Sequence, residues 1–523
     1  MIIPSMRRMM LTTLKLKQMN ELILINEPNL LFGYGQKMED PRDGLTLFGP
    51  IENNLPYGII NGVVGTKDGL KKFRDYLLAL QRPILNANPV SRPFFPGFEA
   101  VFRAKWDVDK IIFKEITDSE IGRELYNADT YARTYKLVSL FADRIIRAVE
   151  DDDARADVWF VIIPDAIYTY CRPNSSIPRE LIAMPKATTR ATAQRMLKGH
   201  APSLYDFIND ENEPYKYDAH FHHQFKARLL HKAIPTQIVR ESTLDWRNYK
   251  KTSGQYIRDF SKIEGHLAWC LSTAAFYKTG GRPWKLANIR PGVCYVGLVY
   301  KKDDRSGDNR NACCAAQMFL DSGDGIVFKG AVGPWYNDVT KEFHLQKRQA
   351  SELINLAVET YRKNTGNYPG ELFIHARTKF DWAEWDGFTS AVPQSTNLVG
   401  VTINTKRPLK IFRPDSDFPM VRGLAYIQSD RSGFLWTKGY VPRLETSLGL
   451  EVPNPLYIEI DKGKASIETV MTDVLALTKL NYNACIYGDG VPVTLRFADA
   501  IGEILTAAPL DKGTPPLSFK YYI

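Results

Sequence analysis

Short apolar runs alternate with helical patterns along the first half of the chain. The runs at 22–26, 58–65 and 157–164 are bounded by turn-forming residues, which is typical of strands. Residues 67–81 instead place apolar side chains at helical spacing, at Leu70, Phe73, Leu77 and Leu80. The run at 157–164 has few polar interruptions, as expected of a parallel strand buried on both faces. The alternation predicts an α/β fold with a Rossmann-like sheet and helices on its faces.

A histidine-rich helix is predicted next, over 221–232. Phe221, Phe225 and Leu229 recur every four residues and give this helix one apolar face. A strand is expected immediately after it, at 235–239.

Another helix is predicted over 260–281. Ser261 and Glu264 have the spacing of a capping box, and Gly280 with Gly281 marks the end. A connection rich in Pro and Gly follows, and we expect the domain boundary there.

The second half has a different order of elements. Strands are expected at 293–300, 312–320, 325–332, 371–377 and 397–404, and helices at 345–364, 468–480 and 496–505. Three strands with hairpin-like links, a helix, and then further strands and helices is the order of a ribonuclease-H-like domain. The predicted domains are therefore 19–285, which is Rossmann-like, and 286–523, which is ribonuclease-H-like.

Composition and charge indicate a globular protein with a basic surface. The 523 residues are 44% hydrophobic and 12% aromatic, and the net charge is +9, which favours polyanionic partners. The six cysteines include no C-x-x-C pair, so a zinc ribbon and a disulfide scaffold are both disfavoured and a reducing cytoplasm is expected. No apolar run reaches eighteen residues, so we expect no transmembrane helix and no membrane partner.

The first eighteen residues have a composition of their own. They carry Arg7, Arg8, Lys15 and Lys17 and no acid, and they contain neither a clean apolar segment nor a small-residue cleavage site. We expect 1–18 to be a disordered or mis-annotated extension.

The histidines of the 221–232 helix do not have the spacing of a metal site. Helical metal ligands recur at i, i+3 or i, i+4, usually with an acid, but the residue four positions after His222 is Lys226. A fixed ammonium beside a divalent cation is electrostatically unfavourable. A histidine–metal site is therefore disfavoured.

The same helix has the spacing of an anion site. His222 and Lys226 are i, i+4 and project from one strip of the helix. Gln237 opens the next strand, and Lys262 lies in the first turn of the following helix, where free N–H groups also attract anions. From spacing alone, an exposed basic helix with a fortuitous lysine and glutamine remains the alternative.

This set of four residues resembles the phosphate-binding set of the MID domain of Argonaute proteins. "GIINGVVG" and "IPTQIV" are similar to MID segments, and "GRPWKL", "VCYVGLVY" and "LALTKLNYNA" are similar to the PIWI domain, which is ribonuclease-H-like. The resemblance covers 19–523 and leaves no room for further Argonaute domains, as in short prokaryotic Argonautes. "DPRDGLTLFGP", "RPFFPGFEAVF", "IRDFSKIEGHLAW" and "FKYYI" resemble the subunit that is paired with a TIR–APAZ protein.

The resemblance implies which residues bind the guide 5′-phosphate. They are His222, Lys226, Gln237 and Lys262, with Thr236 as a weaker addition. In this family the C-terminal carboxylate often helps to hold a Mg²⁺ near the phosphate, and here that carboxylate is expected on Ile523.

The resemblance also implies a mechanism and partners. The chain is expected to load a 5′-phosphorylated guide RNA and to pair it with single-stranded target DNA from an invader such as a plasmid. It is expected to form a heterodimer with a TIR–APAZ protein, which assembles further on target binding, to a tetramer of heterodimers. The partner's TIR domain then hydrolyses NAD, and the cell is depleted of it.

Target cleavage is not expected. Slicing Argonautes hold two metal ions with acids of the PIWI domain. Val299 and Arg377 stand at the positions that match the first and second of these acids, and Asp499 is a lone match for the fourth. The alternatives are a guide-dependent nuclease whose acids are misaligned here, or a short Argonaute paired with a sirtuin-like or membrane effector.

Overall fold

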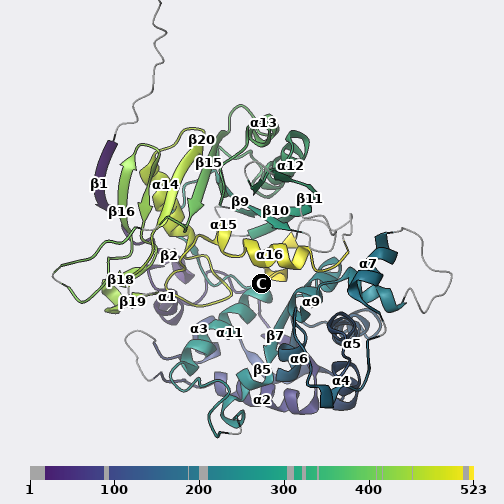
Figure 1. Ribbon diagram of the computed structural model, residues 1–523. Coiled ribbons are helices and arrows are strands. Elements are labelled where there is room, and N and C mark those ends of the chain that lie inside the picture. Colours follow the sequence, from purple (N-terminus) through teal and green to yellow (C-terminus); the bar gives the residue numbers. More distant parts are fainter. Residues whose placement is uncertain are drawn as a thin grey trace, which may run out of the picture.

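The structure of the protein is a computed structural model with two main sheets, a smaller one in the first half of the chain and a larger one formed mostly by the second half (Figure 1). It describes residues 18–86, 93–186, 188–198, 210–251, 253–302, 311–320, 325–337, 341–407, 409–414, 416–449, 452–509 and 517–523. The extension expected over 1–18 lies outside the described residues, except for Gln18.

Four parallel strands form the smaller sheet, in the order β5-β4-β6-β7. They are β4 (Ile59–Gly65), β5 (Trp106–Glu115), β6 (Val158–Ile163) and β7 (Thr236–Arg240). β6 is buried along its whole length, because helices cover both faces of the sheet. The predicted Rossmann-like arrangement is confirmed.

Two groups of helices sandwich this sheet. One face packs against α2 (Lys67–Leu80), α3 (Phe98–Phe102) and α11 (Glu264–Lys278), and the other against α4 (Asp118–Leu125), α5 (Thr130–Glu150) and α9 (Phe221–Leu229). The predicted stripe of Phe221, Phe225 and Leu229 is buried, with the Phe221 ring 5.7 Å from that of Phe141 on α5. Short helices α6 (Asp165–Tyr170), α7 (Arg190–Lys198) and α10 (Glu241–Leu244) lie in the connections.

Ten strands form the larger sheet, in the order β1-β16-β17-β20-β15-β14-β9-β10-β11-β21. Its central strands are β9 (Val293–Lys302), β10 (Asn311–Phe319), β11 (Gly325–Pro334), β14 (Glu371–Ala376), β15 (Asn397–Asn404) and β20 (Leu456–Lys462). Its outer strands are β1 (Gln18–Leu24), β16 (Leu424–Ser429), β17 (Ser432–Leu435) and β21 (Leu517–Ser518). β14 is parallel to both β9 and β15, whereas β9, β10 and β11 are antiparallel, as in the predicted ribonuclease-H-like order.

Helices cover this sheet on both faces as well. α12 (Lys347–Thr365) and α13 (Trp382–Ala391) pack on one face, and α14 (Ile467–Leu477), α15 (Val493–Arg496) and α16 (Ala498–Leu505) on the other. Small two-stranded sheets join β12 (Tyr336–Asn337) to β13 (Glu342–Phe343), and β18 (Gly439–Val441) to β19 (Thr446–Leu448).

The N-terminal strand does not belong to the smaller sheet. β1 pairs with β16 at the edge of the larger sheet, although the predicted boundary assigned residues 19–285 to the first domain. The next strands, β2 (Leu30–Leu31) and β3 (Lys37–Met38), form a small sheet with β8 (Lys285–Leu286). The first segment of the chain therefore crosses the predicted boundary, because strand pairing is decided by long-range partners that local pattern does not show.

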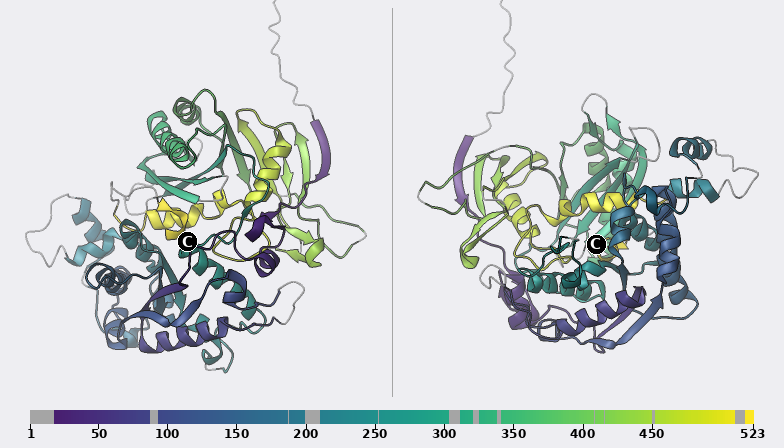
Figure 2. Two further views of the ribbon diagram at one scale, coloured as in Figure 1. Left: turned by 180° about the vertical axis from the view of Figure 1, so that it is seen from behind. Right: turned by 60° about the horizontal axis from the view of Figure 1, so that its bottom comes forward.

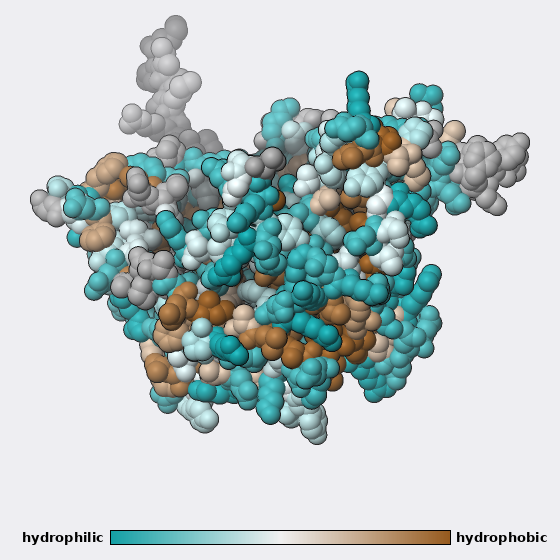
Figure 3. Space-filling view, turned by 90° about the horizontal axis from the view of Figure 1, so that it is seen from below, coloured by the Kyte–Doolittle hydropathy of each residue, from teal (hydrophilic) through white to brown (hydrophobic). Residues whose placement is uncertain are grey.

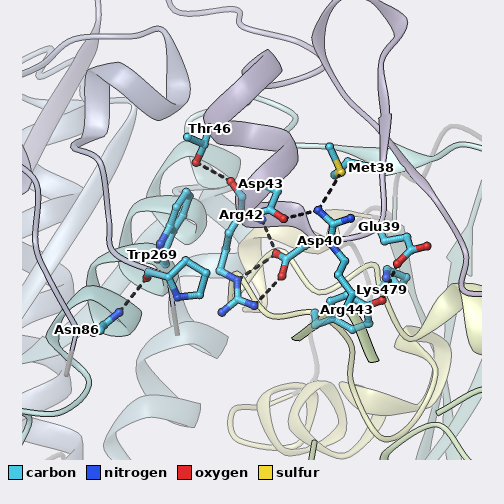
Figure 4. A network of polar contacts seen from close by, with 12 residues as sticks. Met38, Glu39, Asp40, Arg42, Asp43, Thr46, Asn86, Trp269, Arg443 and Lys479 are labelled. Carbon is cyan, nitrogen blue, oxygen red and sulfur yellow. Dashed lines mark hydrogen bonds and ion pairs between the residues drawn. The ribbon is translucent and has the colours of Figure 1, made fainter. Parts of the chain in front are cut away.

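A polar network joins the two halves beside α1 (Pro41–Phe48), as Figure 4 shows. Asp40 caps α1 and forms a buried ion pair with Arg42, with 2.7 Å between Oδ2 and Nη2. Arg443, from the second half, reaches Asp43 of α1 at 2.6 Å, and Lys479 reaches Glu27 at 2.6 Å. These contacts fix the position of the N-terminal segment between the sheets.

Two helix boundaries differ from their predictions. α11 begins at Glu264 without a side-chain cap, so the Ser261–Glu264 capping box does not form. Its end is as predicted, with Gly280 at a φ of 99°. The helix expected at 496–505 is split between α15 and α16 at Phe497.

The outer surface of the first half mixes apolar and hydrophilic residues. Seen from below, apolar patches are broken by hydrophilic side chains (Figure 3). Among the described residues, no helix combines the length and apolar character that crossing a membrane requires.

Candidate anion-binding site

One strand of the smaller sheet, two helices that pack on this sheet and the last residue of the chain meet at the centre of the molecule. α9 contributes His222 and Lys226, β7 contributes Gln237, and α11 contributes Lys278. The C-terminal segment, which follows β21, ends between the two sheets (Figures 1 and 2). Residues far apart in the sequence thus form one cluster.

Lys226 lies at the centre of this cluster. Its side chain is almost fully buried, at 2% exposure, and its Nζ donates to the backbone oxygens of Thr236, at 2.7 Å, and Ile523, at 2.8 Å. Burial lowers the pKa of Lys226 to about 7. The charged form is therefore destabilised in the absence of an anion.

Lys278 is the second buried lysine, at 1% exposure. Its Nζ donates to Gln237 Oε1 at 2.5 Å. Burial, and then the charge of Lys226, lower the pKa of Lys278 well below its ordinary value. Lys278 stands at the last turn of α11, where its charge complements the helix dipole.

The structure does not bring Lys262 to this cluster. Lys262 is exposed and precedes α11, whereas Lys278 ends that 15-residue helix. At 1.5 Å per residue, the two ends of such a helix are about 20 Å apart. Lys262 is thus close to α11 in the sequence but lies at the wrong end of the helix. Lys278 takes the position beside Gln237 that was predicted for Lys262.

The two lysines make an unusual buried pair. Within the described ranges, neither forms an ion pair with an acidic side chain, and the negative group next to Lys226 is the terminal oxygen of Ile523 at 2.8 Å. Buried cations are ordinarily paired, because leaving water is unfavourable for an unpaired charge. The excess of positive charge over negative charge makes this cluster a candidate site for an external anion.

His222 adds an uncharged ring to the site. Burial, and then the charge of Lys226, lower its pKa well below the ordinary value, so the ring is neutral near pH 7. A neutral imidazole can donate one hydrogen bond and can stack on a flat partner. Thr236 contributes its backbone oxygen, while its buried hydroxyl has no partner among the described residues.

Two neighbouring histidines lie beside the site. His220 and His223 stack with ring centroids 3.9 Å apart. His223 Nδ1 lies 3.2 Å from Asp218 and 3.8 Å from Glu503 of α16, a grouping that could hold a metal ion. However, Lys301 already contacts Glu503, at 2.5 Å. A cation in that position disfavours a divalent metal there.

A cavity of about 490 Å³ extends from His222 and Gln237 along the face of α11. Its far end is basic: the Tyr168 ring lies between the guanidinium groups of Arg172, at 3.6 Å, and Arg240, at 3.9 Å. Burial, and then the charge of Arg240, lower the pKa of Arg258, which also lines the cavity. No local sequence pattern connects these arginines, because they lie on three separate segments.

The oxygens of the site do not fit a Mg²⁺ ion. The Ile523 oxygen accepts a hydrogen bond from Lys226, and Gln237 Oε1 accepts one from Lys278. A divalent cation bound to these oxygens would lie beside the nitrogens of Lys226 and Lys278, which is electrostatically unfavourable when the lysines are charged. The only described group with the geometry of a metal site, Asp218 with His223 and Glu503, is the one that Lys301 contacts.

The positions expected to match the acids of a nuclease lie near the carboxyl ends of two central strands of the larger sheet and on α16. Val299 is on β9, and Arg377 follows β14. Arg377 Nη2 lies 3.0 Å from Asp499 Oδ2 on α16. Nearby, His375 is buried and bonded to Thr494 at 2.9 Å, and burial lowers its pKa to about 3.

Solved structures with the same fold are Argonautes. The Argonaute of Clostridium butyricum, bound to a guide DNA and a 19-mer target DNA, has a TM-score of 0.60 at 15% identity, over 94% of this chain and 54% of that chain. Aa-Ago with externally bound siRNA has a TM-score of 0.53 at 15% identity, over 96% and 56%. Aquifex aeolicus Argonaute has a TM-score of 0.51 at 15% identity, over 97% and 57%.

These similarities establish the fold. The chain has the α/β architecture of the MID and PIWI domains and spans little more than half the length of the Argonautes that it matches. No protein-family model matches the chain, and no curated protein matches it.

Proposed function

We propose that the protein binds the 5′-phosphate of a guide RNA between Lys226 and Lys278 and pairs the guide with single-stranded DNA. The observation that carries this proposal is the pair of buried lysines that form no ion pair with an acidic side chain among the described residues. Lys226 contacts the terminal oxygen of Ile523 at 2.8 Å, so one negative group faces two lysine nitrogens. A 5′-phosphate has close to two negative charges at neutral pH, which matches two lysine groups. The neutral ring of His222 and the side chain of Gln237, which contacts Lys278, border the 490 Å³ cavity, where the ring is available to stack on the first base.

Phosphate contacts hold the guide, and base pairing reads the target. Contacts to phosphate carry no sequence information, so sequence specificity comes from the paired strand, as in other guided systems. The Argonautes of similar fold include one bound to a guide DNA and a target DNA, which supports this division of roles.

Lysine groups replace a metal ion at the phosphate. The carboxylate expected on Ile523 then orients Lys226 through the 2.8 Å contact and does not hold Mg²⁺. This version of the site retains His222, Lys226, Thr236 and Gln237 from the sequence analysis and replaces Lys262 with Lys278.

We propose further that the chain does not cut its target. Arg377 and Asp499 neutralise each other at the position where a nuclease would hold metal ions. Signalling would then pass to a partner, and the resemblance of four sequence runs to TIR–APAZ-associated Argonautes favours a TIR–APAZ heterodimer that oligomerises on target binding and hydrolyses NAD.

Nucleic acids that co-purify with the protein test the proposed function. We expect short RNAs with 5′-phosphates in the wild type, and their loss in the variant His222→Ala/Lys226→Ala. The double variant should bind a 5′-phosphorylated guide much more weakly than the wild type does, and its binding of a 5′-hydroxyl guide should change far less. Equal weakening of both guides would refute the phosphate role.

A further inference from the structure

Two cations lie at the carboxyl ends of the central parallel strands of the larger sheet. β9 and β14 are parallel neighbours, with His375 opposite Gly297 as the last pair. Extending this register by two residues sets Arg377, just after β14, level with Val299, and Lys301 lies two residues further along β9. At strand spacings of about 4.8 Å across and 3.3 Å along, their Cα atoms are roughly 8 Å apart. Both side chains project toward α15 and α16, since a Cβ on Gly297 would meet Thr494 of α15.

α16 supplies an acid for each cation. Asp499 pairs with Arg377 at 3.0 Å, and Glu503 pairs with Lys301 at 2.5 Å. The two acids are four residues apart and so lie on one strip of the helix. The two acids of α16 thus lie opposite the two cations near the ends of β9 and β14, and each acid neutralises one cation.

Both ion pairs are accessible enough to be exchanged. The side chains of Arg377 and Asp499 are 55% and 73% exposed, and those of Lys301 and Glu503 are 30% and 34% exposed. Exposed ion pairs of this kind contribute little to stability, so an incoming anion can replace the acid. Arginine binds phosphate with two parallel hydrogen bonds, which favours a phosphodiester as the replacement.

We propose that Arg377 and Lys301 bind the phosphate backbone of a nucleic acid strand, and that Asp499 and Glu503 hold this site closed until the strand arrives. In this placeholder role, the acids of α16 pair with the two cations until phosphates replace them, and they do not bind metal ions. This inference rests on the proposed function, since it requires a guide-loaded protein that captures a target strand.

The position of α16 connects this edge to the guide site. Figure 1 shows α16 between the larger sheet and α9, and it packs against both. Glu503 also faces His223 of α9 at 3.8 Å, and α9 carries Lys226. When a phosphate replaces Glu503 as the partner of Lys301, Glu503 loses this ion pair and keeps only its contact with His223. Strand capture therefore removes one partner from an acid that also contacts the first half of the chain.

The test compares variants of the guide-loaded protein in binding a complementary single-stranded DNA. The variant Asp499→Asn/Glu503→Gln should bind the DNA several-fold more tightly, because phosphates no longer compete with acids. The variant Arg377→Ala/Lys301→Ala should bind more weakly, and the slope of log K against log salt should fall by about one per lysine or arginine removed.

A matched control lies on the opposite face of the same sheet. Lys347 and Asp386 form a comparable surface pair at 2.6 Å between α12 and α13. Asp386→Asn and Lys347→Ala should leave DNA binding nearly unchanged. Equal effects from control and test variants would overturn the proposal in favour of a general charge effect.

The remaining outcomes separate the two proposals. Weaker DNA binding by Asp499→Asn/Glu503→Gln, or binding that depends on Mg²⁺, would overturn the placeholder role. Unchanged binding by all variants would overturn it as well. If the wild-type protein takes up no guide, the proposed function itself fails, and guide uptake is measured first.

Discussion

Replacing Lys278 with methionine separates the structural assignment of the phosphate site from the sequence-based one. Methionine keeps an unbranched side chain of similar length and removes the charge. Lys278→Met should weaken binding of a 5′-phosphorylated guide RNA and leave a 5′-hydroxyl guide nearly unaffected. Lys262→Met, a matched change of the exposed lysine before α11, should affect neither guide.

The magnitude follows from the geometry of the site. Lys278 is 1% exposed and donates to Gln237, which fixes its nitrogen next to that of Lys226. A hydrogen bond to a charged group contributes about 1.5–3 kcal/mol. This loss corresponds to a Kd that is roughly 10- to 150-fold higher.

The assay is fluorescence anisotropy of labelled guide at one fixed salt concentration, since phosphate contacts are salt-dependent. Thermal unfolding of each variant controls for folding. Lys278→Met should unfold at the same temperature as the wild type or higher, because it removes an unfavourable buried charge. The reasoning is refuted if Lys262→Met loses the preference for phosphate while Lys278→Met retains it.

Three further predictions concern pH, metal ions and stability. A bound phosphate raises the pKa of Lys226 from about 7, so binding takes up a proton. Affinity for a 5′-phosphorylated guide should fall between pH 7 and 9, and Lys226→Met should reduce that dependence in a titration series, leaving the part due to Lys278, whose pKa is also lowered. EDTA should leave guide affinity unchanged, and a drop that Mg²⁺ restores would show that a metal holds the phosphate. Arg42→Ala should lower the free energy of unfolding by about 3–5 kcal/mol in urea, because it strands the buried carboxylate of Asp40. The exposed control Arg348→Ala should change it by less than about 0.5 kcal/mol.

Much of the fold was predictable because it depends on local pattern. The apolar run at 157–164 and the stripe of Phe221, Phe225 and Leu229 predict the buried strand β6 and the helix α9. Both patterns show which faces of the strand and of the helix are buried, and this burial largely determines that the two elements form. The edge position of β1 was not predictable, since it depends on pairing with a strand four hundred residues away.

The site was predictable in part for the same reason. His222 and Lys226 share a helix, so their spacing alone places them together. Spacing could not choose between Lys262 and Lys278, because both belong to the α11 segment and only the packing of α11 against β7 decides which end meets Gln237. The contact between Arg377 and Asp499 joins residues 122 positions apart, and no local pattern reports it.

The most direct test of the central claim is the affinity of the wild-type protein for one RNA with either a 5′-phosphate or a 5′-hydroxyl. Both are measured by competition at one pH and one salt concentration. If Lys226 and Lys278 each contribute a charge-assisted contact, the phosphorylated RNA should bind at least about 100-fold more tightly. Equal affinities would contradict the account, because the buried lysine pair would then have no role in holding the guide.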